Sequence, residues 1–591
     1  MNDRLAGLVP CPRSVRALEG TIALTRRPRV RSGTGRPDSQ QALNAVSRVI
    51  ASISWPDPAP DSPAPGATDT TDITVIINDV LGAEAYRLSI TGDGISIEAG
   101  GAPGAFDAAQ TLRQLLPAAA NRAANRAAFP ATPATASTKD AWHVPCALIE
   151  DTPALSWRGG HIDVARHFFP KNELLRLIDA YSALKLNRLH LHLTDDQGWR
   201  VESHRHPRLH EVGSHRPKTR LTHSKDPRAA YDETPHGGYY TLADLAEISA
   251  YAADRMITVV PEIEVPGHAS ALLAALPELG AGQPPEGGYQ VIPDWGIFPY
   301  LMSPLPATMD VLRDIFGELL GAIKTPYVHI GGDECVLDAW RDDPEIDAYR
   351  QQRGLASAAE LHAAFLRDVA DMLAAEYGVR AVVWDEGFAS TGDRPSMLRG
   401  DTIVMAWRGL EIARRAAEAG HDVVAAPVLP TYFDYYQSDL ETEPGGIGGP
   451  VGIMDVAAFT PVPGEWPASA REHLIGTQFQ VWTEYIRNGR ELEYMIFPRA
   501  AALAEVAWTG QALMPGQPGR LPEGTEMPAE LAARLTAHLG RLDAAGVEYR
   551  PLAGPRPWQE GGTGPRRHRS GHRVRDVTKH LDELAAAAES V

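Results

Sequence analysis

The sequence predicts an α/β protein in which a small α+β domain precedes a (β/α)₈ TIM barrel and a short helical extension follows it. The length of 591 residues exceeds what one compact domain commonly holds, so we expect two or three units. Short apolar strands alternate with longer amphipathic helices from residue 155 to about 510, which is typical of such a barrel. Charged and aromatic residues gather where these strands end, and in such barrels the chemistry lies at the carboxyl ends. The predicted boundaries are therefore 1–154, 155–510 and 511–591.

The N-terminal domain is predicted from two strand segments and one helix. Residues 30–70 are rich in Ser, Gly, Pro and Asp, which indicates surface loops. Residues 72–80 favour a strand, and residues 85–100 favour a hairpin because alternating apolar residues flank a Gly-Asp-Gly turn. The apolar residues of 105–120 recur at helical spacing. The stretch 119–137 is expected to be a loop or an insertion.

Strand and helix signals alternate through the barrel region. The predicted strands are 188–194, 257–265, 327–332, 381–386, 402–407 and 474–482, and the clearest predicted helices are 171–186 and 241–256. Beyond residue 510 the sequence predicts one further helix over 528–545. The basic run GPRRHRSGHRVR near the C-terminus is interpreted as a solvated tail instead of an anion-binding arm.

The composition disfavours several classes of protein. The chain has 56 basic and 75 acidic residues, and the resulting net charge of −19 disfavours a nucleic acid or an anionic membrane as partner. Its three cysteines cannot form a disulfide framework and show no paired zinc spacing. The sequence contains no apolar run of about 18 residues and no signal-peptide pattern at its N-terminus, so we expect a cytoplasmic protein without a membrane partner.

Two adjacent carboxyl groups, Asp333 and Glu334, follow a predicted strand in the segment YVHIGGDEC. The two preceding glycines permit tight backbone geometry and close approach of a ligand. Two carboxylates held together in a dry pocket repel each other, so one tends to keep its proton and can act as a general acid while the other stays ionised. The competing interpretation is a helix N-terminus that carries acidic residues.

A second segment, LHLHLTDDQGWR, places His190 and His192 on one face of a strand, and Asp195 and Asp196 follow at its end. A His-x-His pair at a barrel strand end can bind a metal, as it does in amidohydrolases. His268 is a further candidate ligand, but no Lys stands at a matching strand end. Buried, hydrogen-bonded histidines are therefore the preferred interpretation, and neither a metal nor another cofactor is predicted.

A third segment, VVPEIEVPGHAS, carries Glu262 and Glu264 at alternate strand positions and His268 just past a Pro-Gly turn. A lone loop histidine is more often structural than catalytic. If it were coupled to an Asp, however, it could orient a general acid.

Aromatic side chains stand at further strand ends: Trp384, Trp407, Tyr432 with Asp434, and Trp482 with Glu484. A single Trp is usually part of a core, but four such residues at barrel strand ends indicate a stacked pocket. Sugars stack their C–H faces on aromatic rings and bind carboxylates and Arg through their hydroxyls. The composition favours a carbohydrate site, and no phosphate-binding Gly-rich loop stands out.

Together these segments resemble glycoside hydrolase family 20, the β-N-acetylhexosaminidases, from about residue 72 to 550. The similarity is carried by WRGGHIDVARHFFP, KLNRLHLHLTDDQGWR, PEIEVPGHASA, HIGGDE, VVWDE, VWTEY and FPRAAALAEVAW, in this order. Two departures are visible. Glu264 stands where such enzymes commonly carry Asp, and Cys335 stands where an aliphatic residue is usual.

The resemblance implies an exo-acting enzyme that hydrolyses terminal β-linked GlcNAc or GalNAc with retention, through attack by the substrate's own 2-acetamido group. In this mechanism Glu334 protonates the glycosidic oxygen and later deprotonates water. Asp333 orients the acetamide, and Tyr432 bonds its oxygen. The implied partner is a small glycan or glycoconjugate, with chitobiose as one example, and the expected oligomeric state is a monomer or a homodimer.

The resemblance also implies which residues bind and support the sugar. The walls of the acetamide pocket would be Trp384, Trp407 and Trp482, the sugar hydroxyls would be held by Arg158, Asp434 and Glu484, and Glu334 would be supported by the pair Asp195 and His268.

Three alternatives stay open at this point. A lacto-N-biosidase-type member of the family would release a disaccharide, if loops 211–238 and 283–305 formed an extra subsite. A metal-dependent amidohydrolase would use His190 and His192 and would lose activity on dialysis against EDTA. A non-catalytic sugar-binding protein has no need for a general acid, so the pair of Asp333 and Glu334 argues against it.

Overall fold

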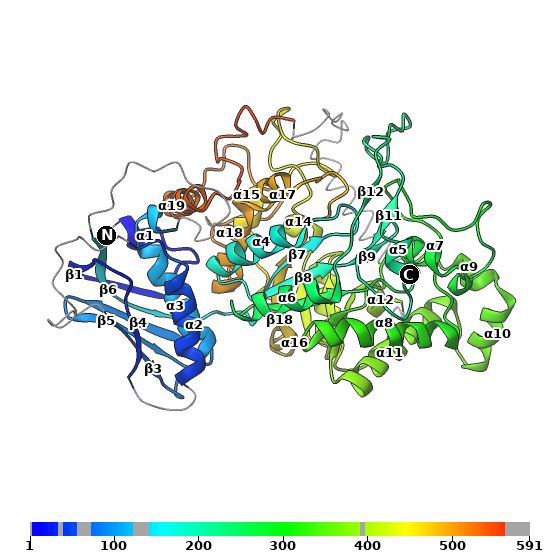
Figure 1. The fold of residues 1–591 in the computed structure, drawn as a ribbon, viewed down its shortest axis with the longest axis horizontal. Coiled ribbons are helices and arrows are strands. Elements are labelled where there is room, and N and C mark those ends of the chain that lie inside the picture. The colour runs from blue at the N-terminus through cyan, green and yellow to red at the C-terminus, as the bar shows by residue number, and fades with distance from the viewer. Residues whose placement is uncertain (1–2, 34–38, 56–71, 122–140, 391–395, 562–591) are drawn as a thin grey trace.

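The computed structural model describes residues 3–33, 39–55, 72–121, 141–390 and 396–561. Figure 1 shows two main parts, an N-terminal domain built on an open sheet and a closed barrel surrounded by helices. The predicted fold class, an α+β domain followed by a (β/α)₈ barrel, is therefore confirmed. The basic run near the C-terminus lies outside the described residues.

The N-terminal domain contains a six-stranded sheet in the order β1-β6-β4-β5-β3-β2. The helices α2 and α3 pack together against this sheet (Figure 1). The predicted hairpin is confirmed, since β4 and β5 pair antiparallel around the Gly-Asp-Gly turn. The strands are β1 (Ser14–Leu24), β2 (Val30–Ser32), β3 (Ile73–Ile77), β4 (Tyr86–Thr91), β5 (Gly94–Ala99) and β6 (Trp142–Asp151), and the helices are α1 (Asp3–Ala6), α2 (Ser39–Ala51), α3 (Ala102–Leu115) and the 3₁₀ turn η1 (Ala118–Asn121).

The prediction of surface loops over residues 30–70 is wrong for the part that the structure describes. Strand β2 and helix α2 form there, and α2 buries Ala42, Val46 and Val49 against α3 and the sheet. These positions have helical spacing, but the periodicity is not evident when residues 30–70 are considered together, because polar and Pro-rich residues flank the helix on both sides. Most of the predicted 119–137 loop lies outside the described residues.

The barrel closes through eight parallel strands in the order β13-β14-β15-β16-β17-β18-β7-β8. All six predicted strands are present, most of them shorter than predicted, and two strands were not predicted as such, β7 and β17. The bounds are β7 (Trp157–Asp163), β8 (Arg188–His192), β13 (Thr258–Glu262), β14 (Tyr327–His329), β15 (Arg380–Trp384), β16 (Ile403–Ala406), β17 (Val423–Ala425) and β18 (Leu474–Phe479); short two-residue strands β9 (Thr194–Asp195), β10 (Gly198–Trp199), β11 (His215–Arg216) and β12 (His236–Gly237) lie in the loops after β8.

Helices surround the barrel, and the three helices predicted from residue 171 onwards are present as α4, α6 and α19. The helix α19 packs against α18 of the barrel and against α1, so it joins the two parts of the chain. The remaining bounds are α4 (Lys171–Ala183), α5 (Arg208–Glu211), α6 (Leu242–Ala253), α7 (Ser270–Ala275), η3 (Pro277–Leu279), α8 (Pro306–Ala322), α9 (Asp338–Asp342), α10 (Pro344–Gln352), α11 (Ala358–Tyr377), α12 (Glu386–Ala389), α13 (Leu410–Glu418), α14 (Val428–Thr431), α15 (Ile453–Ala457), α16 (Ala468–His473), α17 (Gly489–Ile496), α18 (Arg499–Thr509) and α19 (Ala529–Ala545).

The interior of the barrel changes character along its axis. Val260 on β13 and Val382 on β15 belong to an apolar cluster with Trp157 and Ile403. Two residues further along, the same two strands carry Glu262 and Trp384, and these are hydrogen-bonded to each other. The barrel therefore has an apolar layer and, nearer the carboxyl ends of its strands, a polar layer on which a site can be built.

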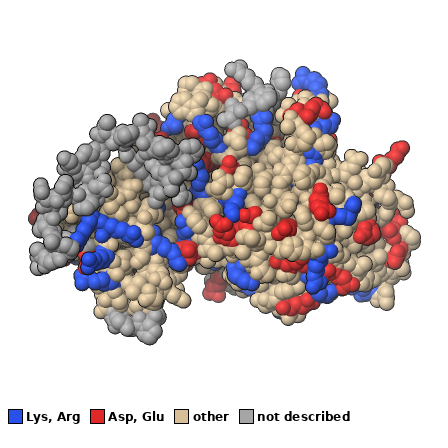
Figure 2. All heavy atoms as spheres, in the orientation of Figure 1, with Lys and Arg blue, Asp and Glu red and all other residues tan. Residues whose placement is uncertain are grey.

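The surface of the barrel carries charges of both signs, which are interspersed on the face shown in Figure 2. Many of them are paired; Lys171, for example, lies 2.6 Å from carboxylate oxygens of both Asp244 and Glu247. Exposed pairs of this kind contribute about 0–1 kcal/mol each, so the buried apolar clusters and not the surface charges hold the fold. Among the described residues, no helix combines the length and apolar character that crossing a membrane requires.

Candidate active site

A cavity of about 680 Å³, its open mouth included, lies at the carboxyl ends of the barrel strands. Every residue predicted for the site lines it except Arg158. The lining residues are Arg166, Asp195, His268, Asp333, Glu334, Trp384, Trp407, Val428, Tyr432, Asp434, Tyr435, Ile447, Trp482 and Glu484.

The two glycines before the acid pair are required by the local geometry. Gly331 and Gly332 have φ angles of 63° and 98°, which side-chain-bearing residues rarely adopt. A Cβ on Gly331 would lie 1.7 Å from Oε2 of Glu264, and one on Gly332 would lie 2.8 Å from Leu366. The chain therefore turns sharply after β14 and presents Asp333 and Glu334 to the cavity.

His268 connects the acid pair to two aspartates behind it. Its Nε2 lies 3.4 Å from Oε2 of Glu334 and 3.8 Å from Oδ2 of Asp333. Its Nδ1 lies 3.3 Å from Asp195 and 3.1 Å from Asp196. Although burial lowers the pKa of His268, the attraction of Asp195 outweighs it and raises that pKa well above its ordinary value. His268 is therefore held as a cation.

Asp333, the first member of the acid pair, is buried at the wall of the cavity. Burial raises the pKa of Asp333 to about 6, an effect that His268 opposes and Glu334 reinforces. One oxygen of Asp333, Oδ1, is buried and has no hydrogen-bond partner among the described residues. An unpartnered buried acceptor at a cavity wall is suited to a donor on a ligand, such as an amide N–H.

Four aromatic rings form a box beside the acid pair. The rings of Trp384 and Trp482 are 5.9 Å apart, those of Trp407 and Tyr432 are 6.3 Å apart, and Tyr432 lies 6.4 Å from Trp482. Burial, with Asp434 adding to it, raises the pKa of Tyr432 well above its ordinary value, so the phenol keeps its proton and can donate it in a hydrogen bond.

Two of these rings are fixed from behind by carboxylates. The indole N–H of Trp384 donates to Glu262 at 2.9 Å, and that of Trp407 donates to Glu386 at 2.9 Å. The walls of the box therefore have defined orientations before any ligand binds.

A cluster of charged groups forms another side of the cavity. Arg166 donates to Gln197 at 2.9 Å, pairs with Asp195 at 2.8 Å and lies over the ring of Trp482 at 5.0 Å. Burial and the nearby Glu484 raise the pKa of Asp434 well above its ordinary value, and Oδ1 of Asp434 has no partner among the described residues. These groups offer donors and acceptors to several hydroxyls.

The assignment of Arg158 to the sugar hydroxyls is wrong. Arg158 is the second residue of β7 and therefore lies toward the N-terminal end of the barrel, away from the cavity. Its guanidinium pairs with Glu84 of the N-terminal domain at 2.6 Å and donates to the carbonyl oxygens of Lys185 and Leu155. The arginine that lines the cavity is Arg166, which follows β7, and its place after a strand end was the signal to use.

The two histidines of the metal-site alternative, His190 and His192, already have protein partners at every ring nitrogen. His190 lies 3.0 Å from Glu262 and 3.0 Å from Gln478. His192 contacts Glu262 through Nδ1 and lies 3.0 Å from Asp195 through Nε2. A metal bound here would have to replace these hydrogen bonds, so the geometry favours the interpretation of buried, hydrogen-bonded histidines.

Comparison with known proteins agrees with this geometry. Residues 155–511 match the family described as glycosyl hydrolase family 20, catalytic domain, and residues 6–152 match glycosyl hydrolase family 20, domain 2. A beta-hexosaminidase of Porphyromonas gingivalis is 35% identical over 485 residues, which are 82% of this chain. This chain spans only 56% of that relative, but it spans 76% of a beta-hexosaminidase of Vibrio furnissii that is 31% identical over 84% of this chain.

The chain is also similar in structure to solved proteins of known fold. The exo beta-N-acetylglucosaminidase of Vibrio harveyi in complex with N-acetylglucosamine has a TM-score of 0.72 and 29% identity, over 93% of this chain and 78% of that one. The N-acetyl-beta-hexosaminidase of Streptomyces plicatus, in complex with Thio-NAglucal, has a TM-score of 0.70 and 29% identity, over 93% of this chain and 98% of that one.

Proposed function

Because the chain belongs to glycosyl hydrolase family 20, we propose that it is an exo-acting β-N-acetylhexosaminidase, which releases terminal β-linked GlcNAc or GalNAc with retention of configuration. The observation that carries this proposal is the position of Asp333 and Glu334 between a cationic histidine and a box of aromatic rings. A sugar with an acetamide arm suits this cavity, since the box accepts the apolar methyl group and the unpartnered oxygen of Asp333 accepts the amide N–H.

In the first step the acetamide oxygen of the substrate attacks its own anomeric carbon while the glycosidic bond breaks. Glu334 gives its proton to the leaving oxygen, and the substrate becomes a bicyclic oxazolinium ion. Asp333 accepts the amide N–H and stabilises the positive charge that develops there. Tyr432 donates to the acetamide oxygen, and the rings of Trp384 and Trp482 keep that arm in the geometry of attack.

In the second step water attacks the anomeric carbon from the face that the aglycone left. Glu334, now a carboxylate, takes a proton from that water, and the C–O bond to the acetamide oxygen breaks. Two inversions at one carbon give net retention. No enzyme carboxylate has to act as nucleophile, which suits a site whose acid pair is adjacent in the chain.

The lining favours release of a single sugar over release of a disaccharide. The cavity holds one aromatic box and one cluster of hydroxyl-binding groups, namely Arg166, Asp434 and Glu484. A lacto-N-biosidase-type enzyme would need a second set for the next ring. The natural partner is, on this proposal, a small glycan or glycoconjugate with a terminal β-linked N-acetylhexosamine.

The test is a release assay on aryl glycosides of β-GlcNAc, β-GalNAc, lacto-N-biose and plain β-glucose. We expect cleavage of the first two, little release of the disaccharide and almost none of glucose, which lacks the acetamide. A thiazoline analogue of GlcNAc, which mimics the cyclic intermediate, should inhibit strongly. Equal cleavage of the β-glucoside, or no inhibition by millimolar thiazoline, would contradict the mechanism. Loss of activity on dialysis against EDTA would instead favour a metal-dependent amidohydrolase.

A further inference from the structure

The carboxylate of Glu262, which the proposed mechanism does not use, lies at the centre of the polar layer of the barrel. It is the last residue of β13 and is fully buried. Its Oε1 accepts a hydrogen bond from Trp384 at 2.9 Å and lies 2.7 Å from Nδ1 of His329. Its Oε2 lies 3.0 Å from His190 and contacts His192. One carboxylate thus connects side chains of three other barrel strands.

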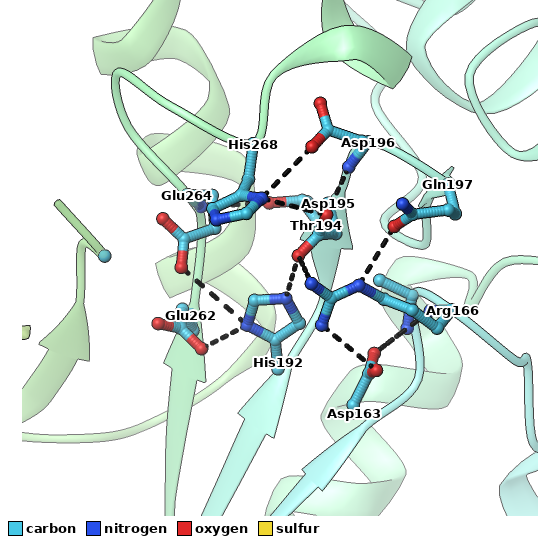
Figure 3. A network of polar contacts seen from close by, with 12 residues as sticks. Asp163, Arg166, His192, Thr194, Asp195, Asp196, Gln197, Glu262, Glu264 and His268 are labelled. Carbon is cyan, nitrogen blue, oxygen red and sulfur yellow. Dashed lines mark hydrogen bonds and ion pairs between the residues drawn. The ribbon is translucent and has the colours of Figure 1, made fainter. Parts of the chain in front are cut away.

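From Glu262 a continuous series of polar contacts leads to the general acid. Nε2 of His192 lies 3.0 Å from Asp195, and Nδ1 of His268 lies 3.3 Å from the other oxygen of that aspartate. Nε2 of His268 lies 3.4 Å from Oε2 of Glu334. Figure 3 shows the part of this series from Glu262 to His268, together with Arg166, which pairs with the same aspartate.

The charges along this series alternate. Both ring nitrogens of His192 face carboxylates, and although burial opposes it, the attraction of Glu262 raises the pKa of His192 to about 10. Burial favours a neutral Glu262, but His329 and His192 hold its pKa well below the ordinary value. A carboxylate, an imidazolium, a carboxylate and a second imidazolium, that of His268, therefore follow one another toward Glu334.

Two other acidic or basic groups beside this series, His190 and Glu264, are neutral. His190 accepts a hydrogen bond from the amide of Gln478, and burial lowers its pKa to about 4. Burial and the nearby Asp333 raise the pKa of Glu264 well above its ordinary value, so this acid keeps its proton although it lies 3.9 Å from His192. Glu262 is thus the ionised group of β13, and it faces the cationic His192 at the start of the series.

We propose that Glu262 is a positioning residue for both halves of the reaction, with Oε1 holding the Trp384 wall that confines the acetamide and Oε2 holding, through His192, Asp195 and His268, the general acid. This inference rests on the proposed hexosaminidase function. An apolar residue could fill the same space without the cost of burying a charge, and branched apolar residues usually fill barrel interiors. The benefit of the carboxylate therefore lies in what it orients.

The experiment measures Glu262→Gln, which keeps the shape and removes the charge, on two kinds of substrate. A dinitrophenyl β-GlcNAc has a leaving group that needs no proton, whereas an alkyl β-GlcNAc depends on Glu334. We expect kcat/KM for the alkyl substrate to fall about 100-fold, for the dinitrophenyl substrate only about tenfold, and the thiazoline Ki to rise about tenfold. Thermal unfolding of the variant checks that it is folded.

Two further variants separate the branches. His192→Gln interrupts the series toward Glu334 and keeps the hydrogen bond between Glu262 and Trp384, so its loss should depend on the leaving group. Because the ring of His192 also lies 5.0 Å from that of Trp482, thiazoline inhibition should weaken, but less than in Glu262→Gln. Trp384→Phe removes the N–H and part of the ring on the acetamide side and leaves the series toward Glu334 in place, so it should weaken thiazoline binding and reduce both substrates equally. In the Glu262→Gln background, Trp384→Phe should lose less than in the parent, because the neutral amide oxygen holds the indole N–H more weakly than the carboxylate does.

The matched control is Glu505→Gln, which removes a buried carboxylate that pairs with Arg534 between α18 and α19, away from the cavity. It should leave both substrates unchanged. A folded Glu262→Gln variant that loses both substrates equally and keeps thiazoline inhibition overturns the inference. If that variant does not fold, an equal loss on both substrates in His192→Gln overturns it instead. Cleavage and thiazoline inhibition of the parent enzyme test the proposed function separately.

Discussion

Two arginines on one strand and the loop after it show how the two ends of the barrel differ. Arg158 begins β7, and every contact of its guanidinium is made with protein, namely Glu84, two carbonyl oxygens and the ring of Trp508. Arg166 follows the end of β7 and faces a cavity in which Asp434 has an unpartnered oxygen. Both side chains are buried, so burial of a charge does not distinguish a binding group from a structural one. What distinguishes Arg166 from Arg158 is that it lies beside acceptors in the cavity that have no partner among the described residues.

The end near Arg158 is an interface between the two parts of the chain. Lys185, which is fully buried, donates to Tyr86 at 2.9 Å and pairs with Asp151 at 3.2 Å, and its ammonium lies 4.4 Å from the ring centre of Trp508. Trp508 also donates to Asp151 at 2.8 Å. These polar groups of the interface thus satisfy one another, as expected of a structural contact.

The largest effect that separates the two ends is expected at the acid pair. Glu334→Gln should reduce kcat/KM for an alkyl β-GlcNAc by about 10²–10⁴-fold, because the leaving oxygen then receives no proton. A dinitrophenyl leaving group should restore a large part of the loss. Asp333→Asn should also reduce kcat strongly with a smaller change in KM, since the charge it stabilises develops only in the transition state.

Steady-state kinetics on both substrates, with thermal unfolding as a control for folding, check this. The melting temperature of both variants should stay within a few degrees of that of the parent. Retention of full activity by Glu334→Gln on the alkyl substrate would remove this residue from the role of general acid.

The second effect compares the two arginines directly. Arg166→Ala should reduce kcat/KM by about 10- to 100-fold, which corresponds to the loss of charge-assisted hydrogen bonds to the sugar. Arg158→Ala should leave kcat/KM of the folded enzyme nearly unchanged but lower the free energy of unfolding by about 3 kcal/mol. This is the low end for a broken buried pair, since Glu84 is partly exposed. Urea unfolding and steady-state kinetics on the same preparations measure the free energy of unfolding and kcat/KM. If Arg158→Ala lowered kcat/KM as much as Arg166→Ala does, the proposed difference between the two arginines would be wrong.

The sequence was sufficient for the fold class because periodicity is local. Apolar strands and amphipathic helices alternate visibly, and the polar residues after the strands indicated the active end. What it missed depends on distant partners. Strand β1 pairs with β6 more than a hundred residues away and shows no regular alternation of burial, and β17 has only three residues.

The site was predictable residue by residue but not as an arrangement. The motif HIGGDE indicated the acid pair, yet the contact of His268 with Asp196 as well as Asp195 follows only from the way the loops after β8 and β13 meet. The choice of Arg158 over Arg166 failed because β7 was not predicted as a strand, so the position of Arg166 after a strand end was not recognised. The role proposed here for Glu262 could not be found in the sequence, since its partners come from three other strands.

The third effect is a pH dependence of kcat/KM. It should arise from the acid pair at the cavity and not from the contacts of Arg158 at the other end of the barrel. Asp333 acts as a carboxylate, and burial raises its pKa to about 6. Below that pH it is protonated, so kcat/KM should fall about tenfold per pH unit on the acid side, with a midpoint near pH 6. Arg158→Ala should keep this profile. A profile that stays flat down to pH 5 would contradict an ionised Asp333 as the working form.

The smallest effect concerns Glu262 and Glu264, which are two residues apart. Their substitution by Gln is expected to change the free energy of unfolding in opposite directions. Burial, reinforced by Asp333, raises the pKa of Glu264 well above its ordinary value, and both of its oxygens lack hydrogen-bond partners among the described residues. The unfolded chain releases this proton above about pH 4.3 and the folded one retains it, so stability is full below that pH and is lost as the pH rises toward the folded pKa. Glu264→Gln removes the proton and should therefore gain stability over the parent by up to about 1.4 kcal/mol per pH unit in that range.

Glu262 supplies the opposite case, since its pKa is held well below the ordinary value. Its ionised form stabilises the fold above about pH 4.3, and that contribution is lost as the pH falls. Glu262→Gln should consequently lose stability relative to the parent at neutral pH and approach it in acid. Urea unfolding of both variants from pH 3 to pH 8 should give differences of opposite sign. The difference for Glu264→Gln grows as the pH rises above about 4.3, whereas the difference for Glu262→Gln is reached by about pH 5, stays constant up to pH 8 and shrinks in acid. If the two differences have the same sign, the unpartnered acid and the paired one have been assigned the wrong protonation states, because only a neutral Glu264 and an ionised Glu262 make the signs differ.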